Sequence, residues 1–202
     1  MTSGHAKEST IQRLKGLPRL FRKQDAEKVA PHTPVFLSRA AAKGLITRLN
    51  RGNYANSFLY GLPRVEEVAC FLRPPAYISC EWALNYHGIS LQVPNVCTVV
   101  TLSTAVGRRY DVDYQGVRIE FSSVAPDLFF GFETVDNFQM AMPEKAILDT
   151  LYLRKGLTAA DEMETEHLDG ERLRQAAQCY PMAVQRRLAA LWDDTNPVQD
   201  DS

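Results

Sequence analysis

Residues 33–55 read TPVFLSRAAAKGLITRLNRGNYA, and this stretch decides how the first part of the chain folds. It predicts a helix over residues 33–43, because Thr33 is a preferred N-cap residue and Pro34 is favoured at the first helical position. Gly44 follows at the place where many helices end in the left-handed conformation. The stretch therefore opens with a short helix whose two ends are both marked.

The predicted helix is amphipathic. Apolar side chains recur at the spacing of one helical face, and we expect these to be buried: Phe36, Leu37, Ala40 and Ala41. The opposite face then points to solvent and holds Val35, Ser38, Arg39, Ala42 and Lys43. The solvent face therefore combines small side chains with two cations.

A β-hairpin is predicted directly after this helix. Residues 45–49 alternate as a strand, with Ile46 or its neighbours facing the core, and Tyr54 starts a return strand. The turn between them, Asn50-Arg51-Gly52-Asn53, is rich in residues that tolerate a positive φ. An arginine therefore lies at the tip of the hairpin.

Two further helices are predicted upstream. Residues 10–17 place Ile11, Leu14 and Leu17 on one helical face, and residues 23–30 form a second short helix that Pro31 closes. Three helices followed by a hairpin with an arginine at its tip is the order of a winged helix-turn-helix, predicted here for residues 1–60. In that geometry the third helix enters the major groove, and the hairpin lies along the backbone or minor groove.

Charge is divided unevenly along the chain. Residues 1–64 hold twelve Lys or Arg against three acids, a balance of +9, and residues 65–202 hold eleven against twenty-one, a balance of −10. A basic module joined to an acidic body is the footprint expected of a nucleic-acid binder. The same charge would also suit an anionic membrane or an acidic protein, so it narrows the class of partner without fixing it.

The sequence predicts DNA contacts at nine positions: Thr33, Val35, Ser38, Arg39, Lys43, Arg48, Asn50, Arg51 and Asn53. Arg39 can offer a bidentate fork to guanine, Ser38 a hydroxyl to a base edge or a phosphate, and Val35 a contact to a thymine methyl. Lys43 and Arg48 are placed to neutralise phosphates, as is the arginine at the hairpin tip, which could instead enter a narrow minor groove. The alternative is a solvated basic face on a winged helix that binds protein.

Residues 61–160 predict a mixed α/β body. The expected elements are helices over 65–72 and 144–153, a helix capped by Ser79, and strands over 76–78, 96–102, 110–112, 117–121 and 132–141. In the helix over 144–153, Lys145 and Asp149 are expected to pair on the outside. We expect a mostly antiparallel sheet, and the fold class is therefore α+β.

Residues 161–202 are predicted to form an acidic connector and C-terminal helices. In the last helix one stripe is apolar: Val184, Leu188, Leu191 and Trp192. This stripe is either a core face or a dimer surface.

Four stretches resemble the AbiEi family, the antitoxin-type transcriptional regulators of bacterial abortive-infection systems (type IV toxin–antitoxin systems). They are GLITRLNRGNY at 44–54, YISCEWALNYHG at 77–88, TVVT at 98–101 and AMPEKAILD at 141–149. Their order and spacing match that family over about residues 20–155. The resemblance implies a repressor of its own operon. It also implies, less firmly, an antitoxin that counters a co-encoded nucleotidyltransferase-like toxin, because stand-alone regulators share the same sequence pattern.

Signals of catalysis are poor, and we expect a protein that is not an enzyme and needs neither cofactor nor metal. The phosphate-binding, dinucleotide-binding and nucleophile-elbow motifs are absent from the sequence, and the four histidines are solitary. The rival interpretation is a metal-dependent nuclease built on these residues: Asp111, Asp113 and Glu120, with Glu144 and Lys145 behind them. That site would lack the lysine usually found just beyond the acid in Val117–Phe121.

The expected partner is operator DNA, in the form of an inverted repeat read by two copies of the chain. We expect a monomer or weak dimer when free, which pairs on DNA. No stretch is apolar enough to span a membrane, and the amino terminus lacks the apolar core of a signal peptide. The four cysteines are far apart and are expected to be free thiols, so we expect a cytoplasmic protein.

Overall fold

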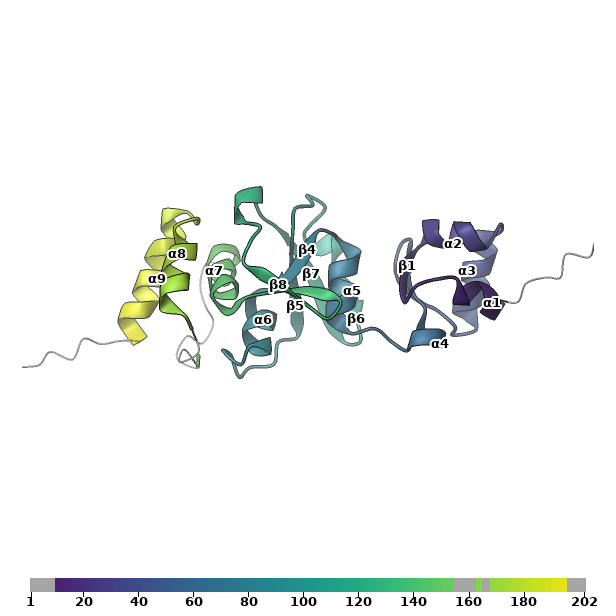
Figure 1. The fold of residues 1–202 in the computed structure, drawn as a ribbon, viewed down its shortest axis with the longest axis horizontal. Coiled ribbons are helices and arrows are strands. Elements are labelled where there is room, and N and C mark those ends of the chain that lie inside the picture. The colour runs from purple at the N-terminus through teal and green to yellow at the C-terminus, as the bar shows by residue number, and fades with distance from the viewer. Residues whose placement is uncertain (1–9, 155–162, 165–167, 196–202) are drawn as a thin grey trace, which may run out of the picture. The chain divides into compact units, whose positions relative to one another are not determined.

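The structure, a computed structural model, describes residues 10–154, 163–164 and 168–195, with side chains described as far as residue 191. The chain divides into two units, Met1–Val68 and Ala69–Ser202 (Figure 1). The domain boundaries that the sequence predicts, after residues 60 and 160, stay predictions. Within the described part, no helix is both long enough and apolar enough to cross a membrane.

The first unit combines short helices with a small sheet. Its elements are α1 (Thr10–Lys15), β1 (Leu20–Arg22), α2 (Lys23–Val29), α3 (Thr33–Ala42), β2 (Thr47–Asn50), β3 (Asn53–Ala55) and α4 (Ser57–Tyr60). The sheet is antiparallel in the order β1-β3-β2, with Leu20 and Thr47 both opposite Ala55. The predicted helices and hairpin are present. Strand β1 was not predicted, because three residues are too few to show a period.

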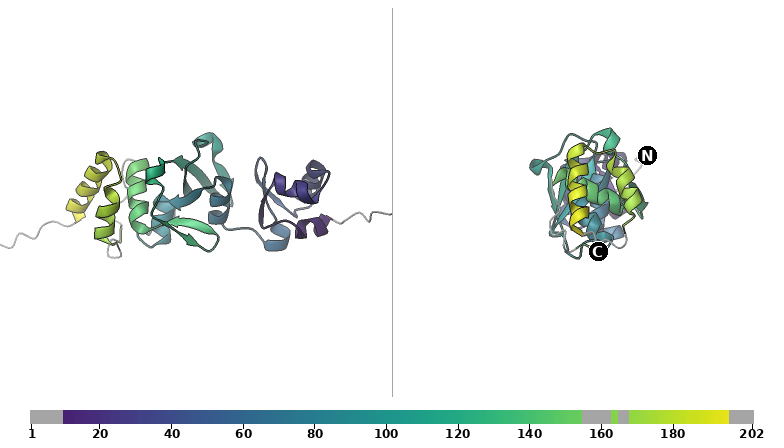
Figure 2. Two further views of the ribbon diagram at one scale, coloured as in Figure 1. Left: turned by 45° about the horizontal axis from the view of Figure 1, so that its top comes forward. Right: turned by 90° about the vertical axis from the view of Figure 1, so that its left-hand side faces the viewer.

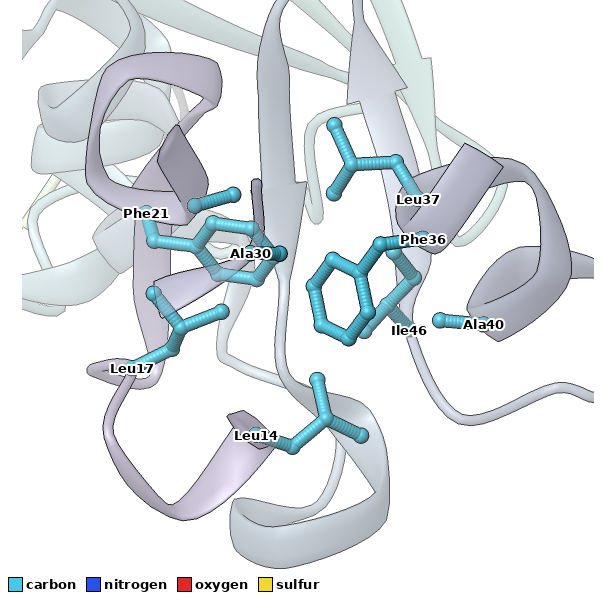
Figure 3. Close-up of a cluster of buried hydrophobic side chains, with 9 residues drawn as sticks. Leu14, Leu17, Phe21, Ala30, Phe36, Leu37, Ala40 and Ile46 are labelled. Carbon is cyan, nitrogen blue, oxygen red and sulfur yellow. The ribbon is translucent and has the colours of Figure 1, made fainter. Parts of the chain in front are cut away.

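One apolar cluster holds the first unit together. Figure 3 shows side chains from α1, α3, the segments between them and Ile46, which follows α3, converging; the buried members are Leu14, Leu17, Phe21, Ala26, Ala30, Phe36, Leu37, Ala40 and Ile46. One sequence prediction was wrong here: Ala41 is exposed, because α3 buries only a narrow stripe. Ile11, on the same predicted face of α1 as Leu14 and Leu17, is 42% exposed, because α1 spans less than two turns.

Both ends of α3 are fixed by hydrogen bonds. The N-cap is His32 and not Thr33 as predicted; the Thr33 hydroxyl is buried and donates to the carbonyl of Ala30 at 2.7 Å. This bond ties the start of α3 to the three-residue connection from α2. At the other end Gly44 adopts a φ of +66°, and its amide donates to the carbonyl of Ala41 at 2.9 Å. The glycine is needed there because residues with a Cβ rarely adopt that conformation.

The second unit is a six-stranded sheet with helices. Its elements are the end of α5 (Val65–Leu72), β4 (Ala76–Ser79), α6 (Cys80–Tyr86), β5 (Val96–Thr101), η1 (Arg108–Tyr110), β6 (Val112–Tyr114), β7 (Val117–Ser123), η2 (Pro126–Leu128), β8 (Phe132–Val135), β9 (Phe138–Ala141), α7 (Pro143–Leu153), α8 (Gly170–Ala177) and α9 (Met182–Thr195). The strand order is β6-β7-β5-β4-β9-β8, and the pairs β5–β7 and β4–β9 are parallel while the other three are antiparallel. The predicted mixed body with a mostly antiparallel sheet is confirmed. The strand predicted over residues 110–112 lies two residues later, as β6.

Helix α7 is buried along most of its length, which corrects the prediction that Lys145 and Asp149 pair on the outside. The Lys145 ammonium donates to Asp149 Oδ1 at 2.7 Å and to the carbonyl of Leu128 at 2.8 Å, and both side chains are inaccessible to solvent. Asp149 Oδ2 accepts from Tyr77 at 3.0 Å, and Tyr180 donates to Oδ1 at 2.7 Å. An i,i+4 spacing shows that two charges share a face but not whether that face is exposed.

Helices α8 and α9 lie side by side at the C-terminal end of the second unit (Figure 2). Val184 and Leu188 of the predicted apolar stripe are buried, and Leu191 is half-buried. The side chain of Trp192 lies outside the described residues, as do residues 161–162 and 165–167 of the predicted acidic connector. Figure 2 and the packing of α7 against both helices therefore favour a core face for the buried part of the stripe.

Candidate nucleic-acid interface

The outer face of α3 is open to solvent. Val35 is 48% exposed, and Ser38, Arg39 and Lys43 are exposed as well. They lie at the spacing of successive helical turns, and the neighbouring positions toward the C-terminus of the helix are alanines. A helix whose outer face carries short side chains around one arginine can approach a flat or grooved partner closely.

The turn between β2 and β3 is held by its own side chains. The Asn53 side-chain amide donates to Asn50 Oδ1 at 2.6 Å, and Arg48 Nε donates to the Asn50 carbonyl at 3.2 Å. Gly52 has a φ of +88°, and its carbonyl accepts from the amide of Lys23, the first residue of α2, at 2.8 Å. These bonds fix the hairpin before any ligand arrives.

The predicted contact residues therefore separate into two groups. Arg48 and Arg51 are exposed on the hairpin, where they can reach a partner. Asn50 and Asn53 are half-buried and use side-chain groups on one another, so their first role is to shape the turn. Thr33 is buried and bonded within the unit, and it has no surface for a ligand.

The cations of this surface lack acidic partners. From Lys28 to Val65 the sequence contains no Asp or Glu. Among the described residues, Arg39, Lys43 and Arg51 make no ion pair. Four other cations of the unit do so, in the pairs Arg19–Glu67 (3.4 Å), Lys23–Glu27 (3.4 Å), Lys28–Asp25 (3.1 Å) and Arg64–Glu66 (3.3 Å).

Asp25 shows how the charges on α2 are paired, in contrast to those on α3 and the hairpin. The backbone amide of Arg22 and the ammonium of Lys28 both donate to its carboxylate, and they lower the pKa of Asp25 below its ordinary value. The acids of the unit are thus consumed by cations on α2 and around α5. The charge on α3 and on the hairpin stays without such partners, and we call this surface the α3–hairpin face (Arg39, Lys43, Arg48 and Arg51).

The acids proposed for a rival nuclease site do not assemble. No group of three or more His, Cys, Asp or Glu in the described part of the chain could hold a metal ion. Glu120 forms an ion pair with Arg154, and Glu144 accepts from the backbone amide of Asp169 at 3.1 Å. Asp111 lies near Glu120. The pKa of Asp111 is raised, mainly by its burial and secondly by the negative charge of Glu120.

The sequence predicted the pairing of Lys145 with Asp149 but not the buried polar cluster around them. Burial lowers the pKa of Lys145, and burial together with the Asp149 charge raises the pKa of Tyr77 and of Tyr180 above the ordinary range. Ser79 also donates to Asp149 Oδ2, at 2.7 Å, instead of capping α6. Each carboxylate oxygen has two donors, and the cluster is closed to solvent, so it joins β4, α7 and the turn between α8 and α9.

Comparison with known proteins shows the fold and no more. A scan against models of protein families finds no match, and a search of curated proteins finds no similar sequence. Among solved structures, the crystal structure of the RV2827C protein from Mycobacterium tuberculosis is similar, with a TM-score of 0.61 and 11% sequence identity. The match covers 93% of this chain and 76% of that protein. The resemblance to the AbiEi family stays a prediction.

Proposed function

We propose that this chain is a sequence-specific, double-stranded DNA-binding transcriptional regulator and that its first unit is a winged helix-turn-helix. In this proposal α3 enters the major groove, which is about 12 Å wide and admits one helix. The β2–β3 hairpin is the wing and contacts the backbone. The protein acts by binding and without chemistry, in the cytoplasm, where its DNA is.

The observation that carries the proposal is the uncompensated charge of the α3–hairpin face. Unpaired cations close together repel one another, so a surface that keeps them away from carboxylates is suited to a polyanion. The three-residue connection between α2 and α3, and the hairpin that follows α3, agree with the arrangement in which such a helix reads base edges.

A binding titration with the full-length protein tests the proposal. Labelled duplex is compared with the same duplex competed by random sequence, and binding sites are enriched from a random library. We expect preference for one sequence and a steep fall in affinity with salt. Enrichment of no sequence, or binding that salt leaves unchanged, would contradict the proposal. Adding Mg²⁺ to the same mixtures should leave the DNA uncut; cleavage would favour the nuclease instead.

We further propose that the regulated promoter is the protein's own and that the chain is an antitoxin to a nucleotidyltransferase-like toxin encoded beside it. The resemblance of four separate stretches to the AbiEi family supports this proposal. Expression of the neighbouring gene alone should arrest growth, and co-expression of this chain should restore it. A neighbouring gene of another class, or arrest that the chain does not relieve, would remove the antitoxin role and leave DNA binding intact.

A further inference from the structure

A second cluster of unpaired arginines lies in the acidic half of the chain. It is formed where α5 ends and where η1 precedes β6, around the ring of Tyr110. The Arg73 guanidinium carbon lies 5.1 Å from the centre of that ring and that of Arg109 lies 4.6 Å from it. Arg108 is exposed beside them. We call these four residues the Tyr110 cluster.

The arginines of this cluster are held in place before any ligand binds. Arg73 Nε donates to the carbonyl of Ala105 at 3.2 Å, and its guanidinium also stacks over Phe121 at 5.4 Å. Arg109 Nη2 donates to the Tyr110 hydroxyl at 2.9 Å. Stacked and anchored guanidinium groups lose little freedom when they bind an anion, because they are already oriented.

The charge around the cluster is not neutralised. The sequence contains no acid between Glu81 and Asp111, although residues 65–202 carry a balance of −10. In the described part of the chain, Arg73, Arg108 and Arg109 form no ion pair. Asp111 follows directly, and the charge of Arg108 acts on its carboxyl without a contact at ion-pair distance. Glu120 and Asp113 also act on Asp111, and Glu120 is itself paired with Arg154, so Arg73, Arg108 and Arg109 keep an excess of positive charge over the carboxyl that follows them.

We propose that the Tyr110 cluster is a second phosphate-binding surface, which contacts the backbone of the duplex that the first unit reads. This inference rests on the proposed function. The two units follow one another in the chain, so DNA held by the first stays at high effective concentration near the second. A weak site is therefore enough to bind DNA that the first unit already holds. An acidic protein, which the first unit does not hold, would have to bind this small surface without that help. Backbone contacts of this kind set affinity and register and not sequence preference.

The test is the double substitution Arg108→Gln and Arg109→Gln in the full-length protein, titrated with the enriched duplex and with random duplex of the same length. Each lost phosphate contact makes the plot of log affinity against log salt shallower by about one unit, so we expect a change of about two units. Between about 50 and 200 mM salt, wild type should then lose roughly tenfold more affinity than the variant. The loss should be equal on both duplexes.

The matched control is Arg174→Gln with Arg186→Gln, which removes the same charge from exposed positions on α8 and α9. It should keep the wild-type salt dependence. If wild type binds DNA and the Arg108/Arg109 variant keeps its full salt dependence, or changes only as much as the control does, the inference is overturned while the proposed function stands. Loss of capture of the toxin with unchanged DNA binding would assign the cluster to a protein partner and also overturn it. If wild type binds no DNA, the proposed function itself fails.

Discussion

Arg39 is the residue that most directly tests base reading. It is exposed in the middle of α3, and it makes no ion pair within the described residues. Val35, Ser38 and Ala42 on the same face have short side chains. We expect Arg39→Ala to cost about 1–3 kcal/mol on the enriched duplex and to relax the preference at one base pair. Competitive binding to all single-base variants of the site measures both effects.

The control for Arg39 is Lys28→Ala. Lys28 is exposed on α2 and pairs with Asp25 at 3.1 Å, so it carries the same charge as Arg39 but is not part of the α3–hairpin face. Its replacement should change affinity little. Equal losses for Arg39→Ala on the enriched and the random duplex would show that α3 contacts backbone and does not read bases.

Arg51 should behave differently because it lies at the tip of the hairpin. Replacing it with alanine should weaken binding to every duplex by a similar factor and make the salt dependence shallower by about one unit. Arg48→Ala should act likewise, with a further effect on the turn since its Nε donates to Asn50. A change of base preference on Arg51→Ala, strongest in A·T-rich flanks, would instead place this side chain in a minor groove.

Tyr180 offers a test of the buried cluster by alkaline titration. Burial, and then the Asp149 charge, raises the pKa of Tyr180, so its phenol stays protonated in the folded protein above pH 10 while the unfolded chain loses that proton. This contribution to stability is complete below about pH 10 and is lost as the pH rises further. Above about pH 10, folded Tyr180→Phe should show the same phenolate absorbance as the folded wild type. After denaturation at the same pH, the wild type should show the absorbance of one phenolate more than the variant. A difference already present in the folded state would mean that Tyr180 is open to solvent.

At the scale of elements, the connection between α2 and α3 depends on Thr33. Its hydroxyl is buried and donates to Ala30 at 2.7 Å. Thr33→Val keeps the size of the side chain but removes this bond, and we expect it to lower the free energy of unfolding by about 1–3 kcal/mol. Chemical denaturation of the full-length protein measures this. At a denaturant concentration where the variant is still folded, its DNA affinity should be unchanged. Reduced affinity would instead support the direct contact between Thr33 and DNA that the sequence predicted.

Sequence patterns predicted those elements whose ends carry local signals. The hairpin follows from Asn50 to Asn53, and the end of α3 follows from Gly44, since both depend on backbone conformations that only a few residue types adopt. The faces of helices were predicted less well where helices are short. Ala41 is small enough to lie on either side of the boundary between the buried and the exposed face of α3. Helix α1 is too short for the helical period alone to show whether Ile11 is buried.

At the scale of the whole molecule, what could not be predicted is non-local. The order of strands in the larger sheet and the burial of α7 depend on partners that lie far away in the sequence. Asp149 shows this, because its donors Tyr77 and Tyr180 are separated from it by 72 and 31 positions. The α3–hairpin face could be predicted from local charge, whereas the Tyr110 cluster could not, since Arg73 reaches the ring of Tyr110 only through the fold.

A full operator requires more contact than one copy of the first unit provides. One winged helix contacts too little DNA for a regulator that must find its site among the many competing sites of a genome. Two copies on an inverted repeat would double the contact, with half-site centres separated by about 10–10.5 base pairs or a multiple of that. The described stripe on α9 is mostly buried, with Val184 and Leu188 inside, so it leaves little apolar surface for a stable dimer in solution.

We therefore expect a chain that sediments as a monomer when free and occupies the repeat cooperatively. Footprinting of the promoter upstream of its own gene, with one half-site scrambled in a second fragment, measures the cooperativity directly. Scrambling should weaken protection of the intact half-site as well, because the copy bound there loses its neighbour. A single asymmetric footprint that ignores the scrambled half would exclude pairing and leave the contacts of the α3–hairpin face unaffected.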